Sequence, residues 1–321
     1  MRYNFPKDFL WGGASSGPQS EGGSCEGGKT PSEWDYWFSI EPERFYDTIG
    51  PSRTSDFYHR YKEYIGKMKE AGIRSFRTSI QWSRVILDQE GTVNPEGIDF
   101  YRQMIRELKK AGIEPMLCLH HFDLPYYWVK EGGFVNRKTV DAFVKFASVV
   151  FREFGEEVKY WSTFNEPVII PETGYFYGRH YPAVCDAAKA VAAGYHIQLA
   201  SSMAVREFKK MGIKGQIGII INLTPTYCRN PEDEGDRKAA EAADLIFNRS
   251  FLDPSVLGQY PKELCELIAG EGLRAPVLEG DLKIIAENKV DYLGVNYYHP
   301  RRVQARTTAF SGPLSPDKYF E

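Results

Sequence analysis

At 321 residues the chain is long enough for one large α/β domain or two smaller ones, and a hydrophobic content of 42% supports a sizeable core. The net charge of −3, with acids and bases interspersed, gives no basic surface for nucleic acid. No apolar run is long enough to cross a bilayer, and we expect no signal peptide. Five scattered cysteines predict neither a disulfide framework nor a zinc site and favour a reduced, cytoplasmic setting; they are Cys25, Cys118, Cys185, Cys228 and Cys265.

Helical stretches that end near glycine alternate along the chain with apolar runs that end on polar or aromatic residues. The pattern predicts strands over 9–14, 73–80, 113–119, 158–164, 216–223 and 290–298. It predicts helices over 56–71, 95–112, 187–211, 236–251, 261–269 and 280–288, and another that begins at Asn136 or Thr139 and ends at Gly155. Because parallel neighbours need crossovers, this alternation indicates a parallel sheet. No linker or low-complexity tract divides residues 1–321, which are therefore expected to form a single domain.

Two architectures satisfy this alternation, a doubly wound sheet and a (β/α)8 barrel. No glycine-rich turn opens a helix after the first strand, as a dinucleotide site in a doubly wound sheet requires. Chemically functional residues instead follow almost every strand, which is typical of a barrel that builds its site from the carboxyl ends of all its strands. The sequence therefore favours the (β/α)8 barrel, of which the chain supplies about the first six β/α units.

Two short patterns suggest a GTPase. Residues 23–30 match the phosphate-binding G-x-x-x-x-G-K-[ST] loop, and residues 288–291 resemble a guanine-reading N-K-x-D. A phosphate loop must directly follow a buried strand, but residues 17–22 do not form one. The second pattern should end an apolar strand, whereas here it ends a helix and begins a strand. We therefore reject the nucleotide-binding interpretation.

The stretch from Val158 to Pro167 is the most informative part of the sequence. Its β-branched and aromatic residues predict a buried strand, which ends at Asn165, Glu166 and Pro167. Burying a carboxyl group there costs several kcal/mol unless the group is paired or used. Burial also raises the pKa of a carboxyl group, as a general acid requires. The alternative is that Asn165 caps the next segment and Glu166 lies in solvent.

Other strand ends carry residues of the same kind, and we predict that all of them meet at one rim of the barrel. Each has an ordinary structural explanation when taken alone: a loop glutamine, an ion-paired arginine, a core histidine or tyrosine, a turn asparagine. Together they suit sugar recognition with acid–base cleavage, because amides and imidazoles bind hydroxyls and a carboxyl protonates the leaving oxygen. The set comprises Gln19, Arg77, His121, Asn165, Glu166, Asn296 and Tyr298.

The chain resembles glycoside hydrolase family 1. The motifs that carry this resemblance run in order from residue 5 to about residue 300. They are Phe-Leu-Trp-Gly-Gly-Ala at 9–14, Gln-x-Glu-Gly at 19–22, Tyr-His-Arg-Tyr-Lys at 58–62, Phe-Arg-Thr-Ser-Ile at 76–80, Asn-Pro-Glu-Gly at 94–97, His-Phe-Asp-Leu-Pro at 121–125, Thr-Phe-Asn-Glu-Pro at 163–167 and Gly-Val-Asn-Tyr-Tyr at 294–298. The resemblance implies a retaining β-glycosidase with no cofactor and no metal.

The resemblance also implies a role for each matched residue. Glu166 is the acid/base and Asn165 holds the 2-hydroxyl of the sugar, while Gln19 and His121 bind other hydroxyls of the glycone. The remaining matches lie close to these: Arg77 and Tyr298 flank the nucleophile, and Asn296 lies near the sugar ring. Phe122 stands where many members have Trp, and Pro18 where many have Tyr or another non-proline residue, both near the glycone pocket.

The sequence departs from the family pattern in one important respect. The family nucleophile is a second glutamate in a Thr/Ser-Glu-Asn-Gly stretch after the seventh strand, and no such stretch occurs here. We therefore expect strands seven and eight, with the nucleophile, to lie beyond Glu321. An incomplete barrel has two open edges, which invite aggregation. Residues 1–321 expressed alone are accordingly predicted to be insoluble or inactive.

The substrate is expected to be a small β-glycoside. Residues 12–19 and 35–46 are most similar to the bacterial 6-phospho-β-glucosidases, which favours a 6-phosphorylated disaccharide and agrees with a cytoplasmic setting. A β-glucosidase for free sugars and a sugar-binding relative without catalysis are the alternatives. The sequence indicates no nucleic-acid or membrane partner. It leaves open whether the protein forms a homodimer and whether it prefers gluco- or galacto-configured sugars.

Overall fold

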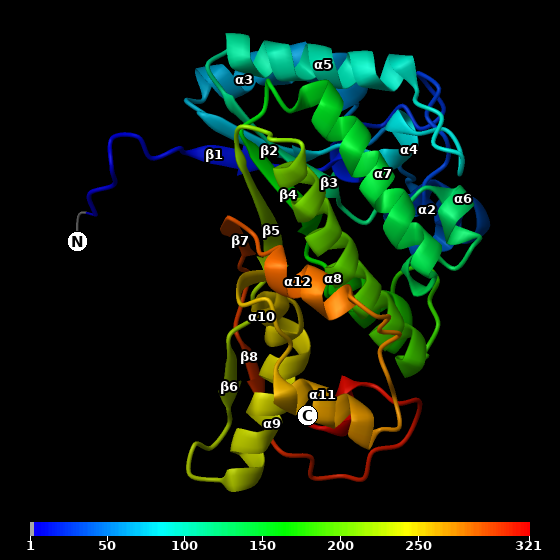
Figure 1. Ribbon diagram of the computed structural model, residues 1–321, viewed down its shortest axis with the longest axis vertical. Coiled ribbons are helices and arrows are strands. Elements are labelled where there is room, and N and C mark those ends of the chain that lie inside the picture. Colours follow the sequence, from blue (N-terminus) through cyan, green and yellow to red (C-terminus); the bar gives the residue numbers. More distant parts are fainter. Residues whose placement is uncertain (1–2) are drawn as a thin grey trace. The chain divides into compact units, whose positions relative to one another are not determined.

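The computed structural model describes residues 3–321, which fold into two compact units (Figure 1). The first unit contains residues 3–126, 149–162 and 214–216. The second contains residues 127–148, 163–213 and 217–321. Four elements have residues in both units: α6 (Tyr126–Val129), α7 (Arg137–Phe154), β4 (Tyr160–Asn165) and β5 (Gln216–Asn222).

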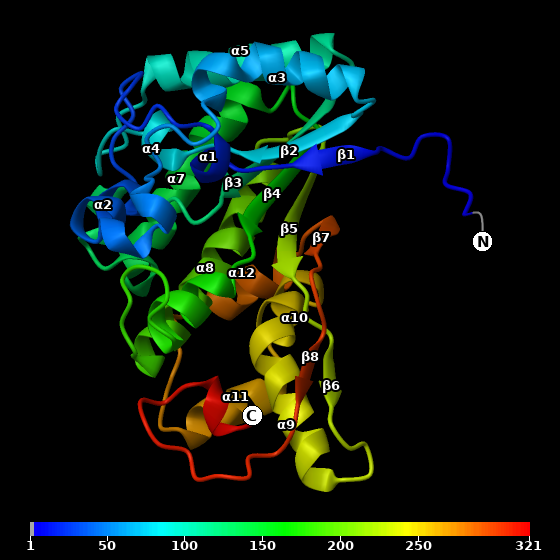
Figure 2. The same ribbon diagram turned by 180° about the vertical axis from the view of Figure 1, so that it is seen from behind.

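The first unit contains three parallel strands, β1 (Gly12–Ala14), β2 (Ser75–Ser79) and β3 (Glu114–His120). Its longest helices, α3 (Phe57–Glu70) and α5 (Pro95–Lys110), lie side by side, as both Figures 1 and 2 show. The shorter helices are α1 (Gly17–Ser20), α2 (Glu33–Ile40), η1 (Pro42–Arg44), η2 (Tyr46–Thr48) and α4 (Trp82–Val85).

The second unit is built around the long helix α8 (Ala187–Lys210), which packs against η3 (Gly133–Val135), the π-helix η4 (Ile170–Phe176) and α12 (Asp281–Glu287). A small parallel sheet of β6 (Thr226–Cys228) and β8 (Arg301–Val303) lies beside α9, as Figure 2 shows. The remaining elements are α9 (Glu234–Asp244), the π-helix η5 (Leu245–Arg249), α10 (Ser250–Val256), α11 (Lys262–Gly270), β7 (Tyr292–Asn296) and η6 (Pro316–Lys318).

The order of the strands distinguishes the two predicted architectures. The main sheet follows the order β1-β2-β3-β4-β5-β7, and β5 pairs with β7 in parallel. Each strand therefore lies next to the strands that precede and follow it in this series. A doubly wound sheet reverses direction at a switch point inside the sheet, whereas a barrel adds its strands consecutively. The strand order thus confirms the predicted barrel class, with six consecutive strands supplied by this chain.

Most predicted elements are present with ends shifted by up to three residues. The first strand is shorter than predicted, because only residues 12–14 pair with β2, and Trp11 remains 54% exposed. The helix predicted over 236–251 extends instead over 234–256 and contains the π-helix η5. The sequence did not predict β6 and β8, since three-residue strands carry too little alternation to be recognised.

The two nucleotide-binding patterns have structural roles. Residues 23–30 form turns, and Lys29 within them donates at 2.6 Å to Asp35 in the first turn of α2. In the second pattern, Asn288 follows α12 and donates to the carbonyl of Ile284, while Asp291 accepts from the backbone N–H of Ile217. These side chains are therefore engaged within the fold.

Candidate active site

Glu166 lies directly after β4 in a backbone conformation that is rare for a side-chain-bearing residue. The backbone angle φ of Glu166 is +49°, and the residue is only 8% exposed. The backbone is fixed on both sides, since the Glu166 N–H donates to Ile220 at 2.7 Å and its carbonyl accepts from Ile169 at 3.0 Å. Left-handed backbone at a non-glycine residue costs on the order of 1–3 kcal/mol and is concentrated at functional sites. Because Glu166 is buried, the alternative that placed its side chain in solvent is wrong.

The side chain of Asn296, at the end of β7, holds the carboxyl group of Glu166. Its Nδ2 donates to Glu166 Oε1 at 2.6 Å and lies 3.1 Å from Oδ1 of the buried Asn165. The hydroxyl of Tyr298 donates to the same Oε1 at a longer 3.5 Å. Tyr298 is 70% exposed, so it is not the core residue that its alternative explanation required. Four predicted site residues of the second unit thus meet around one carboxyl group.

A second carboxyl group, Glu172 on η4, lies in the same electrostatic environment. Burial raises the pKa of Glu172, and the charge of Glu166 raises it further, while Arg301 and Arg179 oppose the shift. Arg301 approaches Glu172 at 3.7 Å and stacks over the ring of Phe247. Sequence reasoning missed Glu172 and Arg301, because neither ends a long strand.

In the first unit, Arg77 on β2 contacts His121, which follows β3. The Arg77 guanidinium lies 3.2 Å from His121 Nδ1. Arginine has no acceptor, so Nδ1 must accept and the proton of the neutral imidazole lies on Nε2. Burial, assisted by Arg77, lowers the pKa of His121 to about 3 and keeps the ring neutral. His121 is therefore fixed as an Nε2–H donor, which suits a sugar hydroxyl.

The other predicted residues of this unit lie on short segments near strand ends. Gln19 is exposed on α1, where its Oε1 accepts from Ser16 at 2.8 Å. Phe122 follows His121 with φ of +60°, and the two rings meet edge to face at 5.0 Å. Glu21, which directly follows α1, pairs with the fully buried Arg84 at 3.0 Å. Glu21 belongs to the Gln-x-Glu-Gly motif, but its pairing with the buried Arg84 was not predicted.

The structure thus assembles the predicted residues as two groups. Arg77, His121 and Phe122 are in contact within the first unit, to which Gln19 also belongs. Asn165, Glu166, Asn296 and Tyr298 meet in the second unit. The prediction that both groups surround one sugar stays a prediction.

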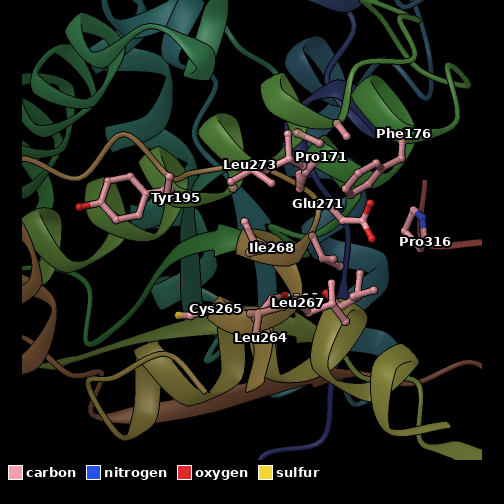
Figure 3. Close-up of a pocket in the computed structure, with 18 of the residues that line it drawn as sticks. Pro171, Phe176, Tyr195, Leu264, Cys265, Leu267, Ile268, Glu271, Leu273 and Pro316 are labelled. Carbon is pink, nitrogen blue, oxygen red and sulfur yellow. Dashed lines mark hydrogen bonds between the residues drawn. The ribbon is translucent and has the colours of Figure 1, made fainter. Parts of the chain in front are cut away.

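The second unit also contains a cavity of about 250 Å³ whose character differs from that of the predicted site (Figure 3). Apolar side chains from η4, α11 and the following loop point into it, among them Pro171, Phe176, Ile268 and Leu273. Sugar hydroxyls need convergent polar groups, which this lining does not provide. We therefore do not place the sugar in this cavity.

The whole of residues 1–317 matches the family model described as glycosyl hydrolase family 1. The chain belongs to this family. It is 49% identical over 322 residues to the 6-phospho-beta-glucosidase GmuD of Bacillus subtilis (strain 168), covering 100% of this chain and 69% of that protein. The family assignment predicted from the motifs is therefore confirmed.

Two further comparisons show the range within family 1. The 6-phospho-beta-galactosidase of Clostridium acetobutylicum is 38% identical over 309 residues, with coverage of 94% of this chain and 64% of that protein. The crystal structure of the psychrophilic beta-glucosidase BglU from Micrococcus antarcticus is 40% identical, with a TM-score of 0.89 over 94% of this chain and 64% of that one. The chain thus spans 64–69% of the length of these three proteins.

Three further features concern the cysteines, the helices and the metal-ligating residues of the described part of the chain. All five cysteines are free thiols. Among residues 3–321, no helix is long and apolar enough to cross a membrane, and no cluster of His, Cys, Asp and Glu could hold a metal ion.

Proposed function

We propose that this chain carries the acid/base and glycone-binding residues of a retaining glycosidase that cleaves β-glucosides. The observation that carries the proposal is the carboxyl group of Glu166, buried at the end of β4 and held by Asn296 at 2.6 Å. Membership of glycosyl hydrolase family 1 supports it. The proposal retains the prediction that residues 1–321 belong to a single catalytic domain. A cytoplasmic setting stays a prediction.

In this mechanism Glu166 acts twice. It first donates a proton to the aglycone oxygen while a second carboxylate attacks the anomeric carbon, about 5–5.5 Å from the acid in retaining enzymes. It then removes a proton from the water that releases the sugar. We assign the nucleophile to no residue of 1–321. The hydrogen bond from Asn296 restrains the carboxyl group through both steps.

The remaining side chains are proposed to bind the sugar. Asn165 presents its amide N–H to the 2-hydroxyl, because its Oδ1 already accepts from Asn296. His121 donates from Nε2, the tautomer that Arg77 dictates, and Gln19 binds a further hydroxyl. Phe122 packs beside the glycone.

Arg77 and Tyr298 are proposed to flank the nucleophile. Both side chains can donate hydrogen bonds, and the guanidinium group of Arg77 also carries a positive charge. Tyr298 also reaches the acid/base, Glu166, at 3.5 Å.

A 6-phosphorylated β-glucoside is the preferred substrate in this proposal. The relative named a 6-phospho-beta-glucosidase is 49% identical, compared with 40% for the beta-glucosidase from Micrococcus antarcticus. The test is hydrolysis of p-nitrophenyl β-glucoside and its 6-phosphate by the full-length protein. A higher kcat/KM for the phosphorylated substrate supports the proposal. A preference for the free glucoside would favour the plain β-glucosidase, and binding without turnover of either would favour a sugar-binding protein.

The role of Glu166 is tested with Glu166→Gln, which keeps the size and removes the acid. We expect kcat/KM to fall about 10²–10⁴-fold for a substrate with a poor leaving group. The loss should be far smaller for a dinitrophenyl glycoside, whose leaving group needs no proton. Glu241→Gln, on the exposed face of α9, is the matched control and should change neither rate. Equal losses on both substrates would refute the acid role.

A further inference from the structure

Asp123 is fully buried two residues after His121, at a position that no sugar-binding role explains. Its Oδ1 accepts from the backbone N–H of His121 at 2.9 Å, and it is 0% exposed. Its Oδ2 has no hydrogen-bond partner among the described residues. A buried carboxyl group costs several kcal/mol unless its hydrogen bonds compensate, so its presence here requires an explanation.

The hydrogen bond closes a tight turn around Phe122. Phe122 adopts a φ of +60°, a conformation that phenylalanine rarely takes outside strained segments. Without the Asp123 acceptor, the buried His121 N–H would lose the hydrogen bond that offsets this strain. The same turn sets the direction in which the His121 side chain leaves β3. Asp123 therefore acts on the backbone that carries the imidazole.

A backbone hydrogen bond ties the turn that carries Asp123 to its surroundings. The carbonyl of Leu124, the next residue, accepts from Glu33 N–H at 2.9 Å, which ties the turn to the first turn of α2. His120 Nδ1 lies 3.6 Å from Oδ1, too far for a hydrogen bond, and burial keeps that imidazole neutral by lowering its pKa to about 3. Asp123 is thus anchored without forming an ion pair.

We propose that Asp123 is a positioning residue that orients His121 toward the glycone through this buried turn. The inference rests on the proposed function, in which His121 binds a sugar hydroxyl. It predicts that Asp123 affects substrate binding only through His121. A residue that merely stabilised the fold would act independently of the imidazole.

The test is a double-mutant cycle in the full-length enzyme with an aryl β-glycoside. We expect His121→Ala to lower kcat/KM about 10- to 100-fold and Asp123→Ala to lower it about 10-fold, from the loss of one buried hydrogen bond each. The double variant should resemble His121→Ala alone, since the turn then has no imidazole to orient. Asp123→Asn keeps the Oδ1 acceptor and should stay within about threefold of the wild type. Losses that multiply in the double variant would overturn the proposal.

A second measurement does not depend on turnover. Hydrogen exchange at the His121 backbone amide should accelerate in Asp123→Ala and remain slow in Asp123→Asn. The matched control is Asp88→Ala, because Asp88 accepts from the N–H groups of Gly91 and Thr92 in a turn away from β3. It should leave both kcat/KM and His121 exchange unchanged.

These measurements test the positioning role of Asp123 separately from the proposed glycosidase function. Unchanged exchange in Asp123→Ala would overturn the positioning role whether or not the protein is a glycosidase. If Asp123→Ala does not fold, Asp123→Asn decides alone: a rate as low as that of His121→Ala, with His121 exchange still slow, would contradict the role. Absence of glycoside hydrolysis by the wild type would instead count against the proposed function.

Discussion

Replacing Asn296 by alanine removes the shortest hydrogen bond to the proposed acid/base. The Asn296 amide lies 2.6 Å from Glu166 Oε1 and 3.1 Å from Asn165 Oδ1. The Glu166 carboxyl group becomes charged as it gives up its proton, and a hydrogen bond to a charged group contributes about 1.5–3 kcal/mol, which corresponds to about 10- to 150-fold in rate. We expect kcat/KM for an aryl β-glycoside to fall by this factor in Asn296→Ala. Most of the loss should be in kcat, because Asn296 holds the reacting carboxyl group.

Two further variants sharpen this prediction. Asn296→Asp replaces the donor with a second carboxylate beside Glu166 and should be more damaging than alanine, since like charges at this distance repel. Asn288→Ala is the matched control, because Asn288 donates at 2.8 Å to the carbonyl of Ile284 at the end of α12 in the same unit. A folded Asn296→Ala enzyme with kcat/KM within about threefold of the wild type would refute the reasoning.

Three predictions concern stability. Arg84→Met should lower the free energy of unfolding by about 3–5 kcal/mol, because it leaves the buried carboxylate of Glu21 without its partner at 3.0 Å. Asp281→Ala should cost a similar amount, about 3–5 kcal/mol, since Asp281 is 2% exposed and accepts two hydrogen bonds from Arg137. Unfolding free energy should also fall between about pH 4 and pH 8, because burial raises the pKa of Asp123 to about 7 and that of Glu33 to about 8.

The sign of the pH effect follows from proton binding. In this window the folded state retains protons on both carboxyl groups that the unfolded state, with ordinary pKa values, has already lost, so raising the pH favours unfolding. Urea unfolding at pH 5, 6.5 and 8 measures the slope, which Glu33→Gln should reduce. Stability that rises over this range, or an unchanged slope in the variant, would contradict the assignment.

The other two stability predictions need surface controls. Arg60→Ala breaks an exposed pair with Glu63 on α3 and should cost less than about 1 kcal/mol. An Arg84→Met variant no less stable than Arg60→Ala would show that the buried pair contributes nothing net. Lys189→Ala serves the same purpose for Asp281, because Lys189 forms an exposed pair with Asp186 at the start of α8. Equal unfolding midpoints for Asp281→Ala and Lys189→Ala would contradict the Asp281 prediction.

Local sequence was sufficient for most of the fold. Helix α5 could be predicted because Asn94 accepts from Glu96 N–H, Pro95 opens the helix and Gly112 follows it with φ of +77°. The strand before Glu166 was recognisable from its β-branched and aromatic residues. These signals depend on a few neighbouring residues, so they survive in the sequence. The π-helix η5 left no such signal, because it differs from an α-helix only in which carbonyl each N–H reaches.

The sequence singled out candidate site residues, but their contacts could not be predicted from it. Glu166 could be singled out by position, yet its φ of +49° depends on hydrogen bonds to Ile220 and Ile169. The burial of Glu172 and Asp123 could not be predicted, since nothing in their local sequence reveals burial beside another charged or titratable group.

The sequence alone determined the alternation of strands and helices and the family, and it singled out Glu166 as the proposed acid/base, because periodicity, caps and motifs are properties of consecutive residues. Only the tertiary structure decided that Asn296 holds Glu166, that Arg77 sets the tautomer of His121 and that Glu21 is paired with Arg84. These contacts join residues 44 to 130 positions apart. Such separations are closed by the packing of whole strands and helices, and that packing is not encoded in any short stretch of the chain.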